Sequence, residues 1–171
     1  MKGLVAVLLA LVLAGLAAWY FFAASESAPP AEMTDAEVAQ IEAEVNQALD
    51  EWWAVWSAAE DYDQFVTIYA DDPDVHWVSD GVPSFGRGEM DANFRPVMEN
   101  MQRQENAPVE WRTFVITPDV AYTVRINDVT QIDLAGNAGP SVRYAETLVW
   151  VKRDGEWKVL FGHGSTPNEP M

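Results

Sequence analysis

Residues 141–165 read SVRYAETLVWVKRDGEWKVLFGHGS, two strand-like runs on either side of Asp154-Gly155. Asp-Gly between alternating apolar runs is the strongest short-range signal of a β-hairpin, because both central residues of a tight hairpin turn need a positive φ. Alternation in the second run predicts one face made of Trp157, Val159, Phe161, His163 and Ser165. This face begins apolar and ends polar, which favours the wall of a binding pocket over a sealed core.

The residues before the hairpin predict helices first and long strands afterwards. Thr34 and Glu37 form a capping box, and apolar residues at spacings of three and four extend a helix from near Asp35 to about Ala59. Two further helices are predicted over 63–70 and 88–103, with a short strand over 75–79 between them. Long strands are predicted over 109–117, 120–133, 141–152 and 157–165.

Helices followed by a meander of antiparallel strands predict the α+β class. We expect a cone-shaped, curved antiparallel sheet wrapped around the long N-terminal helix. The predicted domain covers residues 34–167, preceded by an apolar segment (1–24) and a Pro-containing linker (25–33). Residues 168–171 are expected to be a short tail.

The apolar segment predicts contact with a membrane. Residues 3–24 form an unbroken apolar run after Lys2, and as a helix they would rise about 33 Å, enough for a hydrocarbon core of about 30 Å. The aromatic residues 19–22 lie where an interfacial belt would end a span. We predict an uncleaved signal anchor, single-pass with the domain extracytoplasmic; the alternative is a cleaved signal peptide on a secreted or periplasmic protein.

Composition excludes several classes of function. The net charge of −17 would repel phosphate backbones, so no nucleic-acid partner is expected. The absence of cysteine excludes disulfides, thiolate metal sites and a cysteine nucleophile. The two histidines lack HxH or HxxxH spacing, and the acidic residues at 71–74 lack the glycine and terminal glutamate of an EF-hand loop. We therefore expect no metal and no cofactor.

Three motifs carry a family resemblance over about Asp35 to Ser165. YADDPDVHW (69–77) follows a short helix, SFGRG (84–88) leads into another, and ETLVWVKRDGEWKVLFGHGS (146–165) closes the chain. Together they resemble the SnoaL-like branch of the nuclear transport factor 2-like superfamily. The resemblance implies the cone fold shared with ketosteroid isomerase, a fold that hosts isomerases, dehydratases, cyclases and binding modules.

The candidate site residues lie on the last two strands and the long helix. His163 is the candidate general acid or base, and a packed histidine at the sheet edge is the alternative. A lone arginine on an apolar strand face needs a partner; for Arg143 an internal salt bridge is the commoner one, whereas the resemblance implies that it faces the pocket. Hairpin register places Thr147 near Gly162 or His163, and we predict one cavity with Arg143, Thr147, His163 and Ser165. Trp53, which lies off the main apolar stripe, is a further candidate for ligand binding.

Ketosteroid isomerase chemistry would need an aspartate base together with a tyrosine and a protonated acid. Asp128, Glu146, Tyr122 and Tyr144 are candidates by type. Tyr144 and Glu146 lie on the strand face opposite Arg143, so these residues cannot all line one cavity. The isomerase arrangement is therefore not predicted.

Both faces of the strand at 141–152 are apolar. Tyr144, Leu148 and Trp150 make up the second face, and the sequence offers no remaining helix to cover it. We predict a homodimer that packs sheet on sheet through these three residues. An exposed aromatic strip is the alternative.

Three hypotheses for function follow. The first is a membrane-anchored extracytoplasmic SnoaL-like domain that binds a small, partly apolar molecule in its cone pocket. The second is a lyase or isomerase that uses His163 as general acid or base. The third is a dimerising accessory module with a vestigial pocket.

The anchor can be tested directly on the full-length protein. We expect it to pellet with membranes and to resist carbonate extraction, because a span of this length is held by the apolar core of the bilayer. A purified protein whose N-terminal sequence begins within residues 16–26 would instead identify a cleaved signal peptide.

Overall fold

The computed structural model describes residues 32–167, of which residues 33–167 form one compact unit. Within the described residues, no helix combines the length and apolar character needed to cross a membrane. The predicted anchor (1–24), nearly all of the linker and the tail (168–171) lie outside the described residues.

Helices α2 and α3 begin at side-chain caps. Helix α2 (Asp35–Ala58) starts with the complete capping box, in which the Glu37 amide donates to Thr34 Oγ1 at 3.3 Å and the Thr34 amide donates to Glu37 Oε2 at 2.8 Å. Helix α3 (Tyr62–Val66) starts at Asp61, whose carboxylate accepts from the Gln64 amide. Helix α4 (Gly86–Glu99) contains Pro96 and ends sooner than predicted.

Six strands form one sheet in the order β2-β1-β6-β5-β4-β3. Their bounds are β1 (His76–Ser79), β2 (Val82–Phe85), β3 (Met101–Thr117), β4 (Val120–Asp133), β5 (Val142–Arg153) and β6 (Glu156–Ser165). The sheet is mixed, because β1 runs parallel to β6, so the prediction of a wholly antiparallel sheet is corrected. No strand was predicted over residues 82–85, where β2 lies.

Strand β3 begins eight residues before the predicted strand. Residues 101–108 are mostly polar and show no clear alternation, so the sequence gives little strand signal there. Strand β4 nevertheless runs to Asp133, and its backbone groups need partners along its whole length. The ladder supplies them by pairing Met101 with Asp133, and bulges absorb the irregular spacing.

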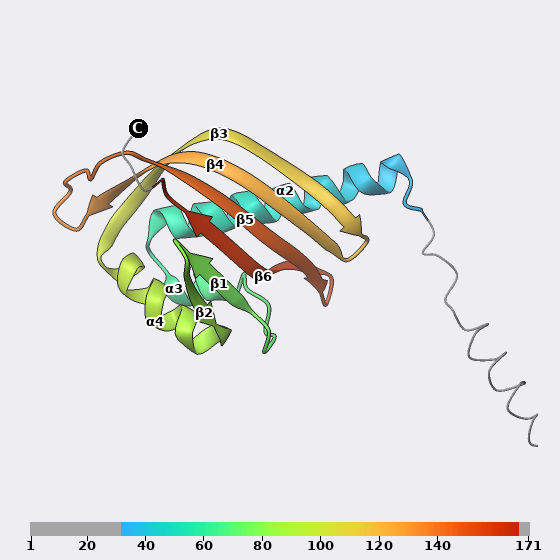
Figure 1. The fold of residues 1–171 in the computed structure, drawn as a ribbon, viewed down its shortest axis with the longest axis horizontal. Coiled ribbons are helices and arrows are strands. Elements are labelled where there is room, and N and C mark those ends of the chain that lie inside the picture. Colours follow the sequence, from blue (N-terminus) through green and yellow to red (C-terminus); the bar gives the residue numbers. More distant parts are fainter. Residues whose placement is uncertain (1–31, 168–171) are drawn as a thin grey trace, which may run out of the picture. The chain divides into compact units, whose positions relative to one another are not determined.

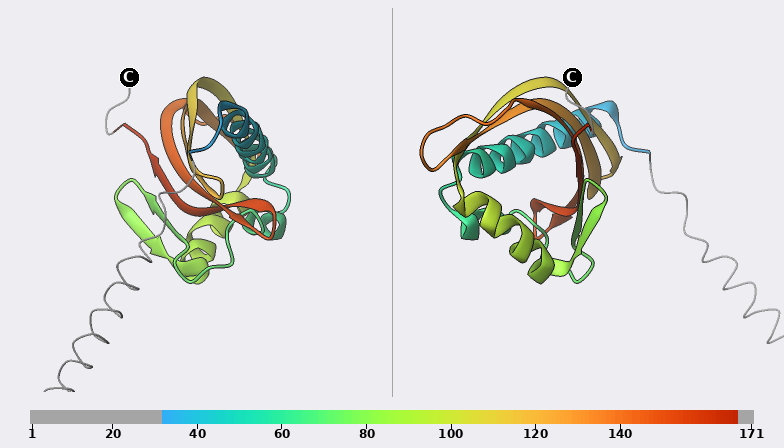
Figure 2. Two further views of the ribbon diagram at one scale, coloured as in Figure 1. Left: turned by 90° about the vertical axis from the view of Figure 1, so that its right-hand side faces the viewer. Right: turned by 60° about the vertical axis from the view of Figure 1, so that its left-hand side comes forward.

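The sheet curves around α2, as Figures 1 and 2 show, while α3 and α4 lie by its β1–β2 end. This is the α+β cone expected from the sequence. The concave face packs on α2, and its core includes Leu49, Trp52, Leu148 and Val159. Apolar burial on this scale is the main force that holds the helix inside the sheet.

The predicted dimer face is on the inside of the cone. Leu148 and Trp150 are fully buried against the core, and Trp150 Nε1 donates to Thr123 Oγ1 at 3.0 Å. Tyr144 faces the same way and is partly buried. The prediction of a dimer through these three residues is therefore wrong. Alternation fixed which residues share a face but could not decide which of two apolar faces covers the helix.

A bulge in β6 changes the face of its second half. Val149 pairs with Phe161, but Trp150 pairs with Val159, so Leu160 is the extra residue. Trp157 and Val159 therefore point inward, whereas the three later members of the predicted face point outward: Phe161, His163 and Ser165.

Glycines occupy the inward positions after the bulge. A Cβ on Gly162 would lie 2.0 Å from ring carbons of Trp77, and one on Gly164 would lie 1.7 Å from the hydroxyl of Tyr144. Both rings can lie close to β6 because these side chains are absent. The glycines thus leave room for Trp77 and Tyr144, two of the rings that line the site described below.

Candidate functional site

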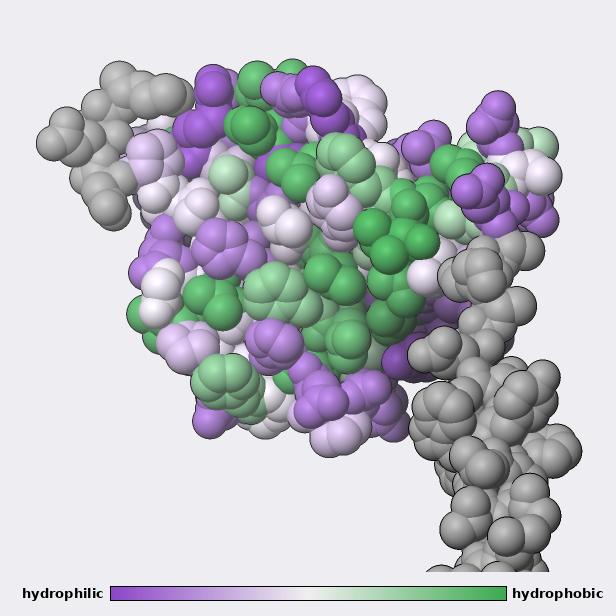
Figure 3. Space-filling model, turned by 45° about the vertical axis from the view of Figure 1, so that its right-hand side comes forward, coloured by the Kyte–Doolittle hydropathy of each residue, from purple (hydrophilic) through white to green (hydrophobic). Residues whose placement is uncertain are grey.

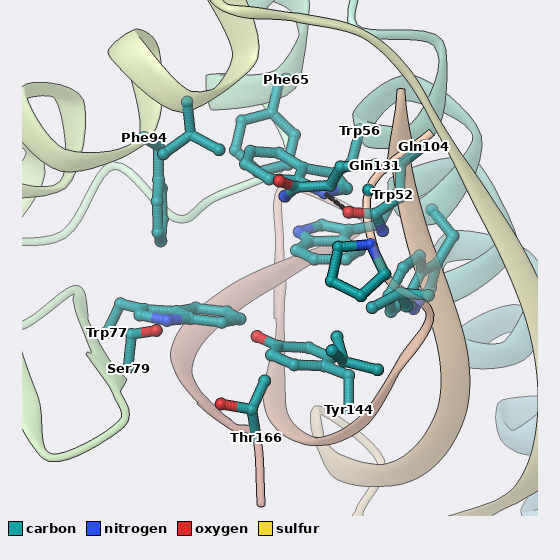
Figure 4. Close-up of a pocket in the computed structure, with 16 residues that line it drawn as sticks. Trp52, Trp56, Phe65, Trp77, Ser79, Phe94, Gln104, Gln131, Tyr144 and Thr166 are labelled. Carbon is teal, nitrogen blue, oxygen red and sulfur yellow. Dashed lines mark hydrogen bonds between the residues drawn. The ribbon is translucent and has the colours of Figure 1, made fainter. Parts of the chain in front are cut away.

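A cavity of about 430 Å³ lies between α2, α4 and the concave face of the sheet (Figure 4). We call it the aromatic cavity. Of the 16 described residues that line it, the aromatic ones are Trp52, Trp53, Trp56, Phe65, Trp77, Phe94 and Tyr144. Aromatic walls of this kind favour flat, apolar ligands.

Helix α2 supplies three indoles from positions that are neighbours on the helix surface. Trp52 stacks on Trp56, with centroids 6.4 Å apart, and on Trp77 of β1, with centroids 6.1 Å apart and planes inclined by 9°. Trp53 lies off this ridge and meets the ring of Tyr144 edge-on at 6.4 Å. The helix thereby joins the two sides of the cavity.

Hydrogen bonds fix the indoles in place. Trp52 Nε1 donates to the hydroxyl of Tyr69 at 3.3 Å, and Trp56 Nε1 donates to Gln104 Oε1 at 3.3 Å. Gln104 in turn donates to Asn106 at 2.8 Å. The walls are therefore held before any ligand arrives, which lowers the entropic cost of binding.

The polar groups of the lining are few and uncharged. They are Ser79, Gln104, Gln131, Thr166 and the hydroxyl of Tyr144, and none of the 16 lining residues carries a formal charge at neutral pH. Burial raises the pKa of Tyr144 well above its ordinary value, so the phenol stays neutral. In Figure 4 its hydroxyl end is directed towards Trp77.

The predicted site residues do not meet in this cavity, except for Trp53, which lines it. Thr147 and His163 are register partners, which is one of the two pairings predicted, but both lie on the convex face of the sheet together with Ser165. Arg143 lies on that face too and donates to Asp128 at 2.6 and 3.2 Å. The predicted placement of these four residues in one cone cavity is therefore corrected, and Arg143 has the internal salt bridge that the sequence left open.

Sequence comparison identifies the family. The SnoaL-like domain matches residues 45–169, which is most of the chain and almost the whole of the described domain. The chain belongs to the SnoaL-like domain family. No curated protein matches it at a significant level.

Solved structures share the fold of this SnoaL-like domain at low sequence identity. A nuclear transport factor 2-like superfamily protein from Salmonella enterica has 13% identity and a TM-score of 0.66, covering 78% of this chain and 96% of its own. A ketosteroid isomerase-like protein from Erwinia carotovora has 17% identity and a TM-score of 0.61, and the match covers 75% of this chain and 97% of that protein. The association domain of CaMKII from C. elegans has 18% identity and a TM-score of 0.60, and the match covers 78% of this chain and 100% of that domain.

Sequence reasoning missed most of the lining of the SnoaL-like cavity. Trp52 and Trp56 belong to the apolar stripe that predicts the long helix, and they pack in the core and also line the cavity. A signal for Trp77 and Tyr144 was present in Gly162-His163-Gly164. Glycines at alternate positions of a strand mark a face that another group approaches closely, and here that group is an aromatic ring at each glycine. Gln131 and Phe94 carried no local signal. Among residues 32–167, no group of three His, Cys, Asp or Glu residues could hold a metal ion.

A buried carboxyl group lies behind the cavity wall. Glu146 is 2% exposed, and its Oε1 accepts from Trp53 Nε1 at 3.2 Å. Its Oε2 has no partner among the described residues. Burial raises the pKa of Glu146 to about 8, although the bond from Trp53 and the charge of Arg125 act in the opposite direction. The carboxyl group is not itself part of the lining.

Arg125 is the cross-strand neighbour of Glu146. Its Nε donates to Asn127 Oδ1 at 3.0 Å, and its guanidinium lies 5.0 Å from the centroid of the Trp53 ring. Trp53 therefore separates the uncharged cavity from a buried polar group of residues on β4 and β5.

Because Glu146 titrates differently in the folded and unfolded states, the free energy of unfolding of the SnoaL-like domain should depend on pH. Between pH 4.5 and about 8 the folded protein keeps this proton while the unfolded chain has released it, so the folded state binds more protons. We expect this carboxyl to lower the free energy of unfolding as the pH rises through that window, by on the order of a few kcal/mol. Glu146→Gln should remove this contribution, as measured by urea denaturation at pH 5 and 8.

The control is Glu51→Gln on the exposed side of α2, which should keep the wild-type dependence on pH. Equal dependence in wild type and Glu146→Gln would show that the carboxyl group does not keep its proton in the folded state.

Proposed function

We propose that this SnoaL-like domain binds a small, uncharged, largely planar apolar molecule in the aromatic cavity. The observation that carries the proposal is the lining: seven aromatic rings, no formal charge, and a volume of about 430 Å³. A charged ligand would lose its hydration without gaining an opposite charge, so such a site selects against it. The hydroxyl and amide groups of the lining would orient one or two polar atoms of the ligand.

The lining favours binding over turnover. Acid–base catalysis needs a titrating group within hydrogen-bond reach of the reacting atoms. Tyr144 is the one ionisable side chain among the lining residues, and burial raises its pKa far from neutrality. Glu146 lies behind Trp53, and His163 lies on the convex face. This arrangement does not favour the lyase or isomerase alternative.

We also propose that the apolar segment 3–24 tethers the domain to a membrane, with the domain on the extracytoplasmic side. The support comes from its length and from the position of its aromatic belt. A tethered binding domain would meet apolar molecules that partition into the bilayer. The cavity chemistry and the anchor thus favour the same class of ligand.

We propose a homodimer through the convex face of the sheet. Phe114 and Tyr122 stack there with centroids 4.6 Å apart, and Val124, Val149 and Phe161 are half-buried on the same face. Figure 3 shows apolar side chains gathered across the middle of the molecule in this view. One structural neighbour is an association domain. Sheet-on-sheet packing of two identical faces would cover these side chains.

Dimerisation can be tested on a chain that starts at Ser25. We expect twice the monomer mass by light scattering, and a monomer after Val149→Glu, because a carboxylate in the interface loses its hydration without a partner. Leu134→Glu, at a 65% exposed position outside the face, is the matched control. Trp150→Glu should unfold the domain instead. A monomeric wild type at micromolar concentration would contradict the proposal.

Ligand binding can be tested with 2-naphthol, a planar bicyclic probe with one hydroxyl group. We expect saturable binding by calorimetry, at least tenfold weaker after Val97→Trp, because Val97 lines the cavity from α4 and is 40% exposed. Val109→Trp, a matched change outside the cavity, and His163→Ala should bind like wild type. Loss of binding in His163→Ala alone would place the site on the convex face.

A further inference from the structure

A second cavity, of about 360 Å³, lies between α2 and strands β3 and β4. We call it the Arg125 cavity. Its lining residues are Asn46, Leu49, Asp50, Pro108, Trp111 and Arg125, none of which lines the aromatic cavity. The two cavities also differ in character, because this one contains charged groups.

Arg125 brings a poorly compensated positive charge into this cavity. The residue is 9% exposed, and its Nε donates a hydrogen bond to Asn127 Oδ1. In the part of the chain that the structure describes, its two terminal nitrogens make no hydrogen bond, and the Oδ1 atom of Asp50 lies 3.7 Å from one of them. The Asp50 side chain is 81% exposed, and a pair with so exposed a partner is weak.

The buried carboxyl group nearby does not neutralise Arg125. Glu146 is its cross-strand neighbour, but among the described residues no ion pair joins the two side chains, and burial raises the pKa of Glu146, which disfavours its charged form. A buried guanidinium without a hydrogen-bonded counter-charge is costly. An anion that reached the terminal nitrogens would recover part of that cost.

The other walls specify what kind of anion fits. Trp111 is the register partner of Arg125, lines the same cavity and is 57% exposed, so it offers accessible aromatic surface to a ligand there. Leu49 and Pro108 add apolar contacts. Asn46 Oδ1 accepts from Thr113 Oγ1 at 2.6 Å, which leaves the amide nitrogen of Asn46 as a further donor.

We propose that the Arg125 cavity binds a small aromatic carboxylate. The terminal nitrogens of Arg125 hold the carboxylate in a fork, the geometry for which a guanidinium is best suited. The aromatic ring packs on Trp111. This site shares no lining residue with the aromatic cavity and takes a charged ligand, so the proposal does not depend on the proposed function.

The test is calorimetric titration of the full-length protein in lipid nanodiscs with sodium benzoate. We expect saturable binding to wild type and roughly three- to tenfold tighter binding to Asp50→Asn, because that change removes the carboxylate that competes for Arg125. Glu51→Gln, the same change of charge at the next position, should leave the affinity unchanged. Trp111→Ala should weaken it at least threefold, and Arg125→Gln should abolish it.

Several results would overturn the proposal. If neutral benzyl alcohol bound as tightly as benzoate, the carboxylate would not be recognised. If inorganic phosphate bound as tightly as benzoate, the aromatic ring and Trp111 would contribute nothing. An unchanged affinity in Asp50→Asn would show that the anion does not reach Arg125, and this gain of affinity cannot arise from misfolding. Val97→Trp blocks the aromatic cavity and should leave benzoate binding intact; loss of binding there would assign benzoate to the wrong cavity.

Discussion

The stack of Trp52 between Trp56 and Trp77 is the contact on which the rest of the domain depends. It joins α2 to β1, the strand next to the edge strand β2, and the same rings form both the core and the wall of the cavity. The stack needs room against β6, and Gly162 provides it by leaving the space of one side chain empty under Trp77. Fold and site are thus consequences of one packing arrangement.

Trp53 has an uncharged cavity on one side and ionisable side chains on the other. The aromatic cavity has an uncharged lining, whereas Arg125 and Glu146 lie behind the indole on neighbouring strands. The indole nitrogen donates to Glu146 and its ring receives the guanidinium of Arg125. One side chain therefore keeps ionisable groups out of an apolar site, which explains why a cavity rich in aromatic rings can exist close to two buried polar residues.

The sequence predicted the elements better than it predicted the site. The capping box at Thr34, the Asp154-Gly155 turn and the bounds of β4 were all confirmed, because each depends on local backbone chemistry. The faces were not predictable: β5 is apolar on both sides, and the single extra residue Leu160 reverses the second half of β6. His163 was consequently placed inside the cone, where Gly162 and Gly164 face instead.

A crystal structure of the domain with 2-naphthol bound would test the aromatic cavity as the ligand site most directly. We expect the probe to lie flat among Trp52, Trp77 and Tyr144, with its hydroxyl group bonded to a polar group of the lining and the indoles unmoved. A cavity closed by its own side chains, or a probe bound on the convex face beside His163, would contradict this assignment.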